Sequence, residues 1–137
     1  MTISSASWDT LEGDFLEEQE AEAPSLELLD EVFRSLDGVT HTLLCVQHDG
    51  GASLMIGGGP TQYVVCLETA EGSLYTLTRE TDETAKVCLT AGGQEGDYPG
   101  RQVVGKELAR GALTWFVEGG LELAGLPGWE KDVGDGP

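Results

Sequence analysis

Two histidines carry the most versatile chemistry in this sequence, and their spacing limits what they can do. His41 and His48 stand seven residues apart in a segment rich in β-branched and apolar residues. Seven residues of extended strand span about 23 Å, so the two imidazoles cannot share a metal ion or act as a catalytic pair. We therefore expect both histidines to lie at the surface or at the edge of a sheet.

Three cysteines are the next candidates for chemistry. Cys45, Cys66 and Cys88 are each isolated, and the sequence contains no CxxC pair. Such usage argues against a zinc ribbon, a dithiol redox motif and a secreted disulfide framework. Each cysteine lies among apolar strand residues, where a free thiol usually behaves as a small hydrophobe. The pattern is typical of a protein in a reducing cytoplasm, and we expect no catalytic cysteine.

A glycine run offers one further motif. Gly57-Gly58-Gly59 resembles part of a phosphate-binding loop, but no Lys and Ser/Thr follow it, and Pro60 leads into a strand rather than a helix. A structural turn that uses positive φ angles is the favoured interpretation. The chain also lacks HExxH, GxSxG and DxDxDG-type patterns. We therefore predict no catalytic residues, no cofactor and no metal site, and a protein that is not an enzyme.

Charge says more about function than these motifs do. The chain of 137 residues has 25 acidic and 7 basic residues, a formal net charge of −18. Such a charge repels nucleic acids and anionic membranes and favours a basic protein as partner. No apolar run approaches the roughly 20 residues needed to cross a bilayer, and the N-terminus has no basic and apolar regions of a secretory signal.

Carboxylates are concentrated in two predicted loops that could contact such a partner. The predicted contact residues are Glu80, Asp82, Glu83, Glu95, Asp97 and Tyr98. Each cluster is either a solvated surface or a patch complementary to a basic cleft. Tight binding also requires a desolvated anchor, because charges at the rim of an interface affect rates more than lifetimes. Tyr98 is the first candidate for this anchor, and Trp8 is the second.

The segment 1–24 is an acidic N-terminal arm that contains no Lys or Arg. Two interpretations remain open for it. It is a solvated tail, or it contains a short amphipathic helix in which Trp8, Leu11 and Phe15 form a stripe that docks on this domain or on a partner. Pro24 marks its end.

Residues 25–137 are predicted to form a single α+β domain. Residues 25–37 are expected to form a helix that Ser25 caps, with Gly38 as its stop. Strands are expected at 40–47, 52–56, 62–69, 73–78 and 86–90, with a hairpin turn at Asp49-Gly50-Gly51.

A loop at 92–100, a second helix over 101–118 and a short final strand near Trp129 complete the predicted order. Short strands separated by turns indicate an antiparallel meander rather than βαβ units. We therefore expect an α+β fold: an antiparallel sheet of about five or six strands, with an N-terminal helix and a C-terminal helix packed on it.

The C-terminal third contains a recognisable pattern. Residues 107–120 read ELARGALTWFVEGG, residues 126–129 read LPGW, and residues 54–77 read LMIGGGPTQYVVCLETAEGSLYTL. Together these segments resemble the first-numbered immunity-protein family of bacterial polymorphic toxin systems, over about residues 38–130. The family's alanine-rich helix, phenylalanine, glycine stop and tryptophan correspond here to Ala109, Ala112, Phe116, Gly119 or Gly120, and Trp129. We expect Phe116 and Trp129 to be core residues.

The resemblance implies a cytoplasmic immunity protein that is encoded beside a secreted toxin, often a nucleic-acid deaminase or a nuclease. Such a protein would bind the toxin's catalytic domain, as a monomer in a one-to-one complex, and block it. A toxin that binds nucleic acid needs a basic groove, toward which a strongly acidic inhibitor is attracted. The alternative is an acidic adaptor or nucleic-acid mimic that binds several basic proteins.

Overall fold

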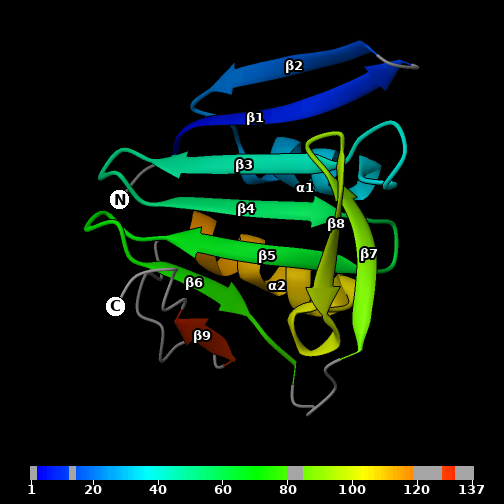
Figure 1. Cartoon of the computed structure of the whole chain (residues 1–137). Coiled ribbons are helices and arrows are strands. Elements are labelled where there is room, and N and C mark those ends of the chain that lie inside the picture. The colour runs from blue at the N-terminus through cyan, green and yellow to red at the C-terminus, as the bar shows by residue number, and fades with distance from the viewer. Residues whose placement is uncertain (1–2, 13–14, 80–84, 119–127, 132–137) are drawn as a thin grey trace.

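The computed structural model describes residues 3–12, 15–79, 85–118 and 128–131 (Figure 1). The elements in chain order are β1 (Ile3–Glu12), β2 (Phe15–Glu22), α1 (Leu26–Ser35), β3 (Leu43–His48), β4 (Ser53–Gly58), β5 (Tyr63–Glu68), β6 (Leu74–Leu77), β7 (Lys86–Ala91), β8 (Gln94–Pro99), a 3-10 turn (Gly100–Gln102), α2 (Lys106–Val117) and β9 (Trp129–Lys131).

The main sheet has seven antiparallel strands in the order β2-β1-β3-β4-β5-β6-β9, and β7 and β8 form a separate two-stranded sheet. Both helices cover one face of the main sheet, and the β7–β8 hairpin crosses the opposite face at one end (Figure 1). The predicted α+β class is confirmed. The sheet is larger than the five or six strands expected, α1 follows two strands, and α2 precedes the last strand.

The first helix forms where the sequence predicts it. Ser25 accepts a hydrogen bond from the Leu28 N–H at 3.1 Å, which satisfies one of the free donors in the first turn. Leu29, Val32 and Phe33 are buried on one side of α1, as their helical spacing requires.

The predicted meander from β3 to β6 is also present. The turn at Asp49-Gly50-Gly51 closes with a 2.8 Å hydrogen bond from the His48 N–H to the Ala52 carbonyl. Gly51 has a φ of +104°, which a residue with a side chain rarely adopts. Gly58 and Gly59 also have positive φ, which fits the prediction of a structural turn there.

Residues 3–12 and 15–22 form strands, so the expectation of a solvated tail or a short helix is wrong, whereas the expected docking on this domain is confirmed for β1. β1 pairs with β3 on one side and with β2 on the other, so Trp8 lies between Gln19 and Leu44. The spacing of Trp8 and Leu11 suggested one helical stripe, but in a strand residues separated by three positions point to opposite faces. β1 forms because its backbone hydrogen-bonds to β3, and the sequence of residues 1–24 alone contains no sign of this pairing.

The expected loop at 92–100 is likewise a strand for most of its length. β8 pairs with β7 through a turn at Gly92 and Gly93, whose φ angles are +63° and +79°. The register places Val87 opposite Tyr98.

The second helix begins later than predicted. Residues before Lys106 form a 3-10 turn and a short bridge, in which Val104 and Tyr63 exchange backbone hydrogen bonds of 2.8 and 2.9 Å. Ala109, Ala112, Leu113 and Phe116 form the buried side of α2. The short strand predicted near Trp129 is present as β9.

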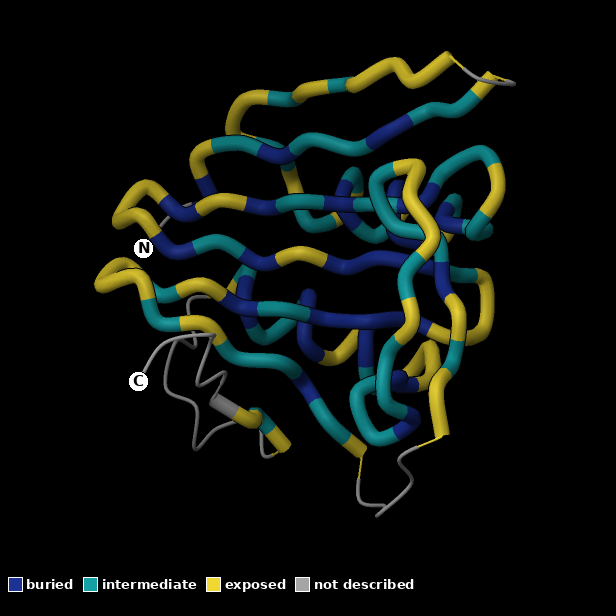
Figure 2. Tube along the Cα trace, in the orientation of Figure 1, coloured by how far each residue is buried: buried dark blue, intermediate teal, exposed yellow. Residues whose placement is uncertain are grey.

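Burial alternates along the central strands (Figure 2). Leu44, Leu54, Ile56 and Val65 face the helices and have no exposed surface. Phe33 and Tyr63 stack within this core, with ring centroids 5.1 Å apart. The intervening residues of the same strands lie on the other face of the sheet.

Candidate binding surface

We use the name open face for the side of the main sheet opposite α1 and α2. Across its centre the strand registers place Ser7, Cys45, Met55, Cys66 and Thr76 in one row, one residue from each of β1, β3, β4, β5 and β6. Neighbouring strands lie about 4.8 Å apart, so this row is about 19 Å long. Met55 at its centre is 43% exposed. The row is a shallow floor of sulfur-containing and small side chains.

The β7–β8 hairpin covers one end of the open face. Leu89 forms a small buried cluster there with Val64 and Val103. The two layers approach closely, because a Cβ on Gly57 would lie 2.6 Å from the Cβ of Ala91. Glycine at position 57 therefore allows the hairpin to rest on β4.

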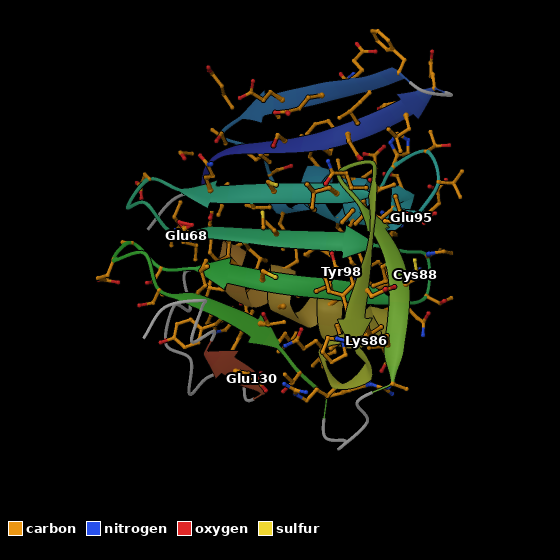
Figure 3. The ribbon with its side chains drawn as sticks, viewed as in Figure 1. Glu68, Lys86, Cys88, Glu95, Tyr98 and Glu130 are labelled. Atoms are coloured by element: carbon orange, nitrogen blue, oxygen red, sulfur yellow. The ribbon has the colours of Figure 1, made fainter. Side chains whose placement is uncertain are left out.

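Tyr98 forms the wall where the hairpin meets the exposed floor. Its ring packs against the cluster of Val64, Leu89 and Val103 together with Cys66, and it projects from β8 over the sheet (Figure 3). Burial raises the pKa of the Tyr98 phenol, and the neighbouring thiols of Cys66 and Cys88 raise it further. The phenol is therefore a neutral hydrogen-bonding group beside the floor.

A buried carboxylate fixes this arrangement from the N-terminal side. Asp9 is 5% exposed. Its Oδ1 accepts hydrogen bonds from the N–H groups of Thr42 and Leu43 at 2.7 and 2.9 Å. Its Oδ2 accepts from the Thr42 hydroxyl, and that hydroxyl accepts from the Gly93 N–H at 3.0 Å. Asp9 thus connects β1, the start of β3 and the turn of the β7–β8 hairpin.

A hollow of about 210 Å³ opens between the hairpin turn and β1–β3, and Ser7, Leu16, Glu18, Leu43 and Cys45 contribute to its lining. Burial raises the pKa of the Cys45 thiol; the nearby charges of Glu18 and Asp9 raise it too, while a hydrogen bond with Ser7 opposes them. Cys45 is therefore protonated at neutral pH and is a poor nucleophile.

The open face is acidic over β1 to β6, because these strands supply carboxylates and no cations. β1 to β6 contain no Lys or Arg. The registers place Glu18, Glu20 and Glu22 of β2 on the open face, in line with the side chains of β1, and Glu68 of β5 lies there as well. On the helix side, by contrast, Arg34 and Arg110 both contact Asp30, at 3.4 and 2.8 Å.

At the far end of the central row, Glu130 of β9 lies opposite Thr76. It accepts hydrogen bonds from Arg101 at 3.0 and 3.2 Å, and these lower the pKa of Glu130. This pair fixes the short strand β9 to the segment that follows β8.

The structure divides the predicted contact residues. Glu95 and Asp97 are exposed and lie on the outer side of the β7–β8 hairpin, whereas Tyr98 points inward. The second cluster, Glu80, Asp82 and Glu83, lies outside the described residues. The other expected anchor, Trp8, is partly buried and packs against the core on the helix side.

His48 does not lie at the surface as expected. It is 3% exposed because the alternation of β3 directs it toward the helices. Its Nε2 lies 2.7 Å from the Phe116 carbonyl, so Nε2 carries a proton and donates, and the two rings meet edge to face at 4.3 Å. His41 instead bonds through Nδ1 to the Asp9 carbonyl at 2.9 Å. Both imidazoles therefore have structural partners.

Cys88 also differs from expectation, because it is exposed. It lies opposite Asp97 on the outer side of the hairpin rather than among apolar residues. Within the described residues, no three His, Cys, Asp or Glu side chains are grouped to hold a metal ion.

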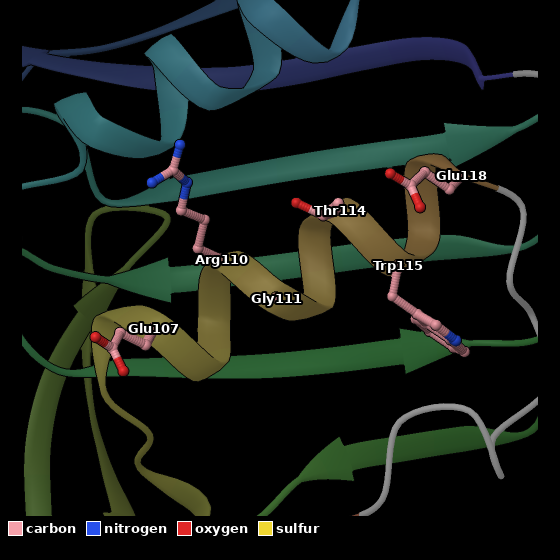
Figure 4. Close-up of a pocket in the computed structure, with 6 residues that line it drawn as sticks. All are labelled: Glu107, Arg110, Gly111, Thr114, Trp115 and Glu118. Atoms are coloured by element: carbon pink, nitrogen blue, oxygen red, sulfur yellow. The ribbon is translucent and has the colours of Figure 1, made fainter.

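A second depression, of about 580 Å³, runs along the outer side of α2 (Figure 4). Gly111 forms its floor, with Glu107 and Glu118 near its ends. Its cation Arg110 is already bound to Asp30 through two hydrogen bonds of 2.8 and 3.0 Å. The depression combines both charge signs, so it has less electrostatic selectivity for a basic partner than the open face.

In the described part of the chain, no helix combines the length and apolarity needed to cross a membrane. Comparison of the chain with protein families, curated proteins and solved structures finds no match.

Proposed function

We propose that this protein is a non-catalytic immunity protein, which binds the basic catalytic domain of a cognate secreted toxin in the cytoplasm and blocks it. The toxin class proposed is a nucleic-acid deaminase or nuclease. The observation that carries the proposal is the open face: a row about 19 Å long centred on Met55, beside the Tyr98 wall, in strands that contain no Lys or Arg.

The chemistry of this face suits a groove that normally holds a phosphate backbone. Carboxylates of Glu18, Glu20 and Glu68 can take the places of phosphates against Arg and Lys. Met55 adapts its shape to an irregular surface, and Tyr98 offers a rigid ring with a polar end. The sequence resemblance of residues 107–120 and 126–129 to the immunity-protein family also supports this proposal.

A pull-down with the product of the neighbouring gene, after co-expression, tests the proposal directly. The expected result is a one-to-one complex whose association slows markedly as salt is raised, since steering by charge is screened. Equal binding to several unrelated basic proteins would identify an acidic adaptor instead, and turnover of a substrate by this protein alone would contradict the proposal.

The cysteines provide a footprint of the contact surface. Cys45 and Cys66 lie on the open face, and Cys88 lies on the outer side of the hairpin. At a pH raised until the Cys45 thiol of the free protein also reacts, bound toxin should protect Cys45 and Cys66 from a thiol reagent and leave Cys88 reactive, so Cys88 is an internal control. Protection of Cys88 alone would place the contact on the outer side of the hairpin.

A charge inserted into the floor gives an independent test. Met55→Arg should abolish binding, because it places a cation where a basic partner docks, and should leave the melting temperature nearly unchanged. Val39→Arg is the matched control: Val39 is 73% exposed in the connection from α1 to β3, and the charge change is the same. Equal affinity of the two variants would exclude the open face as the contact surface.

A further inference from the structure

The outermost strand, β2, has an unpaired edge. It is eight residues long, ends the strand order of the main sheet and pairs only with β1. Six of its residues are exposed, and the other two, Gln19 and Ala21, are partly exposed. An exposed edge of this length is a template for another strand unless charge or shape prevents pairing.

Two hydrogen bonds determine which backbone groups of β2 are free. The Ala23 N–H donates to the Ser4 carbonyl at 2.9 Å, and the Leu11 N–H donates to Thr40, on the β3 side, at 2.7 Å. Because hydrogen-bonded and non-bonded pairs alternate in an antiparallel ladder, odd-numbered residues of β2 bond to β1. The even-numbered residues, Leu16, Glu18, Glu20 and Glu22, therefore direct their N–H and C=O groups toward the free edge.

Three of these four even-numbered residues are glutamates, while the other glutamate of β2, Glu17, lies on the opposite face. Glu18, Glu20 and Glu22 place their side chains on the open face, opposite Asp9, Ser7 and Ser5 of β1. If a second copy of β2 paired antiparallel along this edge, glutamates would oppose glutamates, which is unfavourable. Repulsion between glutamates therefore disfavours pairing of β2 with a second copy of itself. A basic strand could instead form main-chain hydrogen bonds with this edge and place its cations opposite the glutamates.

We infer that the free edge of β2 accepts a β-strand of the partner in which Lys or Arg occupies every second position and faces Glu18, Glu20 and Glu22. The inference rests on the proposed function for the identity of the partner, since it adds the mode of binding and the required sequence pattern. Main-chain hydrogen bonds to β2 supply binding, and the alternating cations set register and face.

An eight-residue peptide that alternates lysine with valine tests the pairing without the toxin. In the free protein, amide hydrogens of Glu18, Glu20 and Glu22 should exchange quickly, and those of Glu17, Gln19 and Ala21 slowly. Added peptide should protect the even-numbered amides. A peptide of the same composition with its lysines consecutive should bind more weakly, by about fivefold or more, and protect no alternating set.

Proline at position 20 separates backbone pairing from charge. Glu20→Pro removes an N–H that points to the free edge, so the ladder to β1 remains intact, and binding of the alternating peptide should fall clearly below that of Glu20→Gln, which loses the same charge. Gln19→Pro is the structural control, because its missing N–H would disrupt the pairing with β1.

Equal binding of Glu20→Pro and Glu20→Gln, or of the two peptides, would overturn the inference. With the toxin itself, complex formation without protection of the even-numbered amides would also overturn it, while the proposed function stands. Protection by the alternating peptide, in a protein that binds no toxin, would support the edge as a basic-strand site and reject the proposed function.

Discussion

On the helix side of the sheet Leu54 has no exposed surface, whereas Met55, the next residue of the same strand, is 43% exposed on the open face. The helix side contains a continuous core that includes Leu44, Val65 and Phe116. Among the residues that the structure describes, the open face has only the small cluster under the β7–β8 hairpin, and the remaining floor is not covered by it. Because side chains alternate along each strand, the residues of the core and the residues proposed to bind a partner are different residues of the same strands.

The largest loss of stability is expected from a substitution in the core on the helix side of the sheet. Phe116→Ala should lower the free energy of unfolding by about 3–5 kcal/mol, since it removes a fully buried ring and leaves a cavity. Urea denaturation measures the loss. The fraction that remains folded should bind the partner with unchanged affinity; weakened binding with an unchanged unfolding midpoint would assign Phe116 to the interface.

The second prediction concerns Asp9, which is the only buried carboxylate among the described residues and connects β1 to the frame of the open face. Asp9→Ala should cost about 2–3 kcal/mol, because it leaves the buried N–H groups of Thr42 and Leu43 without their acceptor. Exchange of the Gly93 amide should also accelerate, since Thr42 loses its orientation. Glu12→Ala, at an exposed position of the same strand, should change stability by no more than about 0.5 kcal/mol.

Truncation of the floor should give the opposite result to truncation of the core. Met55→Ala should change the free energy of unfolding by less than about 1 kcal/mol, because 43% of the residue is exposed and its truncation leaves no enclosed cavity. Affinity for the partner should fall about tenfold or more if Met55 is a central contact. Calorimetric titration with the toxin domain measures this, and an unchanged dissociation constant together with an unchanged stability would remove Met55 from the interface.

The smallest effect concerns the connection from the helix layer to the sheet. Partial burial alone would raise the pKa of Asp37, but its Oδ1 accepts hydrogen bonds from the N–H groups of His41, Val39 and Thr40, at 3.0, 2.9 and 2.8 Å, and the net result is a lowered pKa. A carboxyl whose pKa is lower in the folded state stabilises the fold above its unfolded pKa and loses that contribution as pH falls.

The stability difference between wild type and Asp37→Asn should therefore be about 1 kcal/mol or less near pH 6 and should shrink as pH falls below about 4. Denaturation of both proteins across this range measures it. A difference that grows on acidification would contradict the assignment of the lowered pKa to these hydrogen bonds.

In this protein the sequence correctly predicts the features that depend on residues close together in the chain. Ser25 caps α1 through a contact three residues away, and Asp49-Gly50-Gly51 closes its hairpin through neighbouring backbone. β1 was missed because its partner β3 is distant in sequence, and β8 was missed because its own residues are poor strand formers. β8 contains Gly96 and Pro99 and becomes a strand only by pairing with β7.

The candidate site was predicted less well than the fold, and strand geometry explains why. Asp97 and Tyr98 are adjacent in sequence, so a loop could have presented both to one partner, but in a strand they point to opposite sides. The central row, with Cys45, Met55 and Cys66 at its middle, was missed because each of its members comes from a different strand. The alternation of side chains in 43–48, 53–58 and 63–68 does contain a signal, because every second residue of each strand is less bulky or less apolar than its neighbours. Alignment of the three segments as neighbouring strands would have placed these residues side by side in one row.

The hydrogen-bond chain from Asp9 through Thr42 to Gly93 makes the hairpin that frames the floor dependent on the first strand. Cleavage of the chain just after position 9, or an N-terminal fusion that displaced β1, would first disorder the turn at Gly93, which is distant in sequence. The hairpin turn and the floor beside it would then lose their order before the helices melt, so an intact β1 is a practical requirement for every binding assay on this molecule.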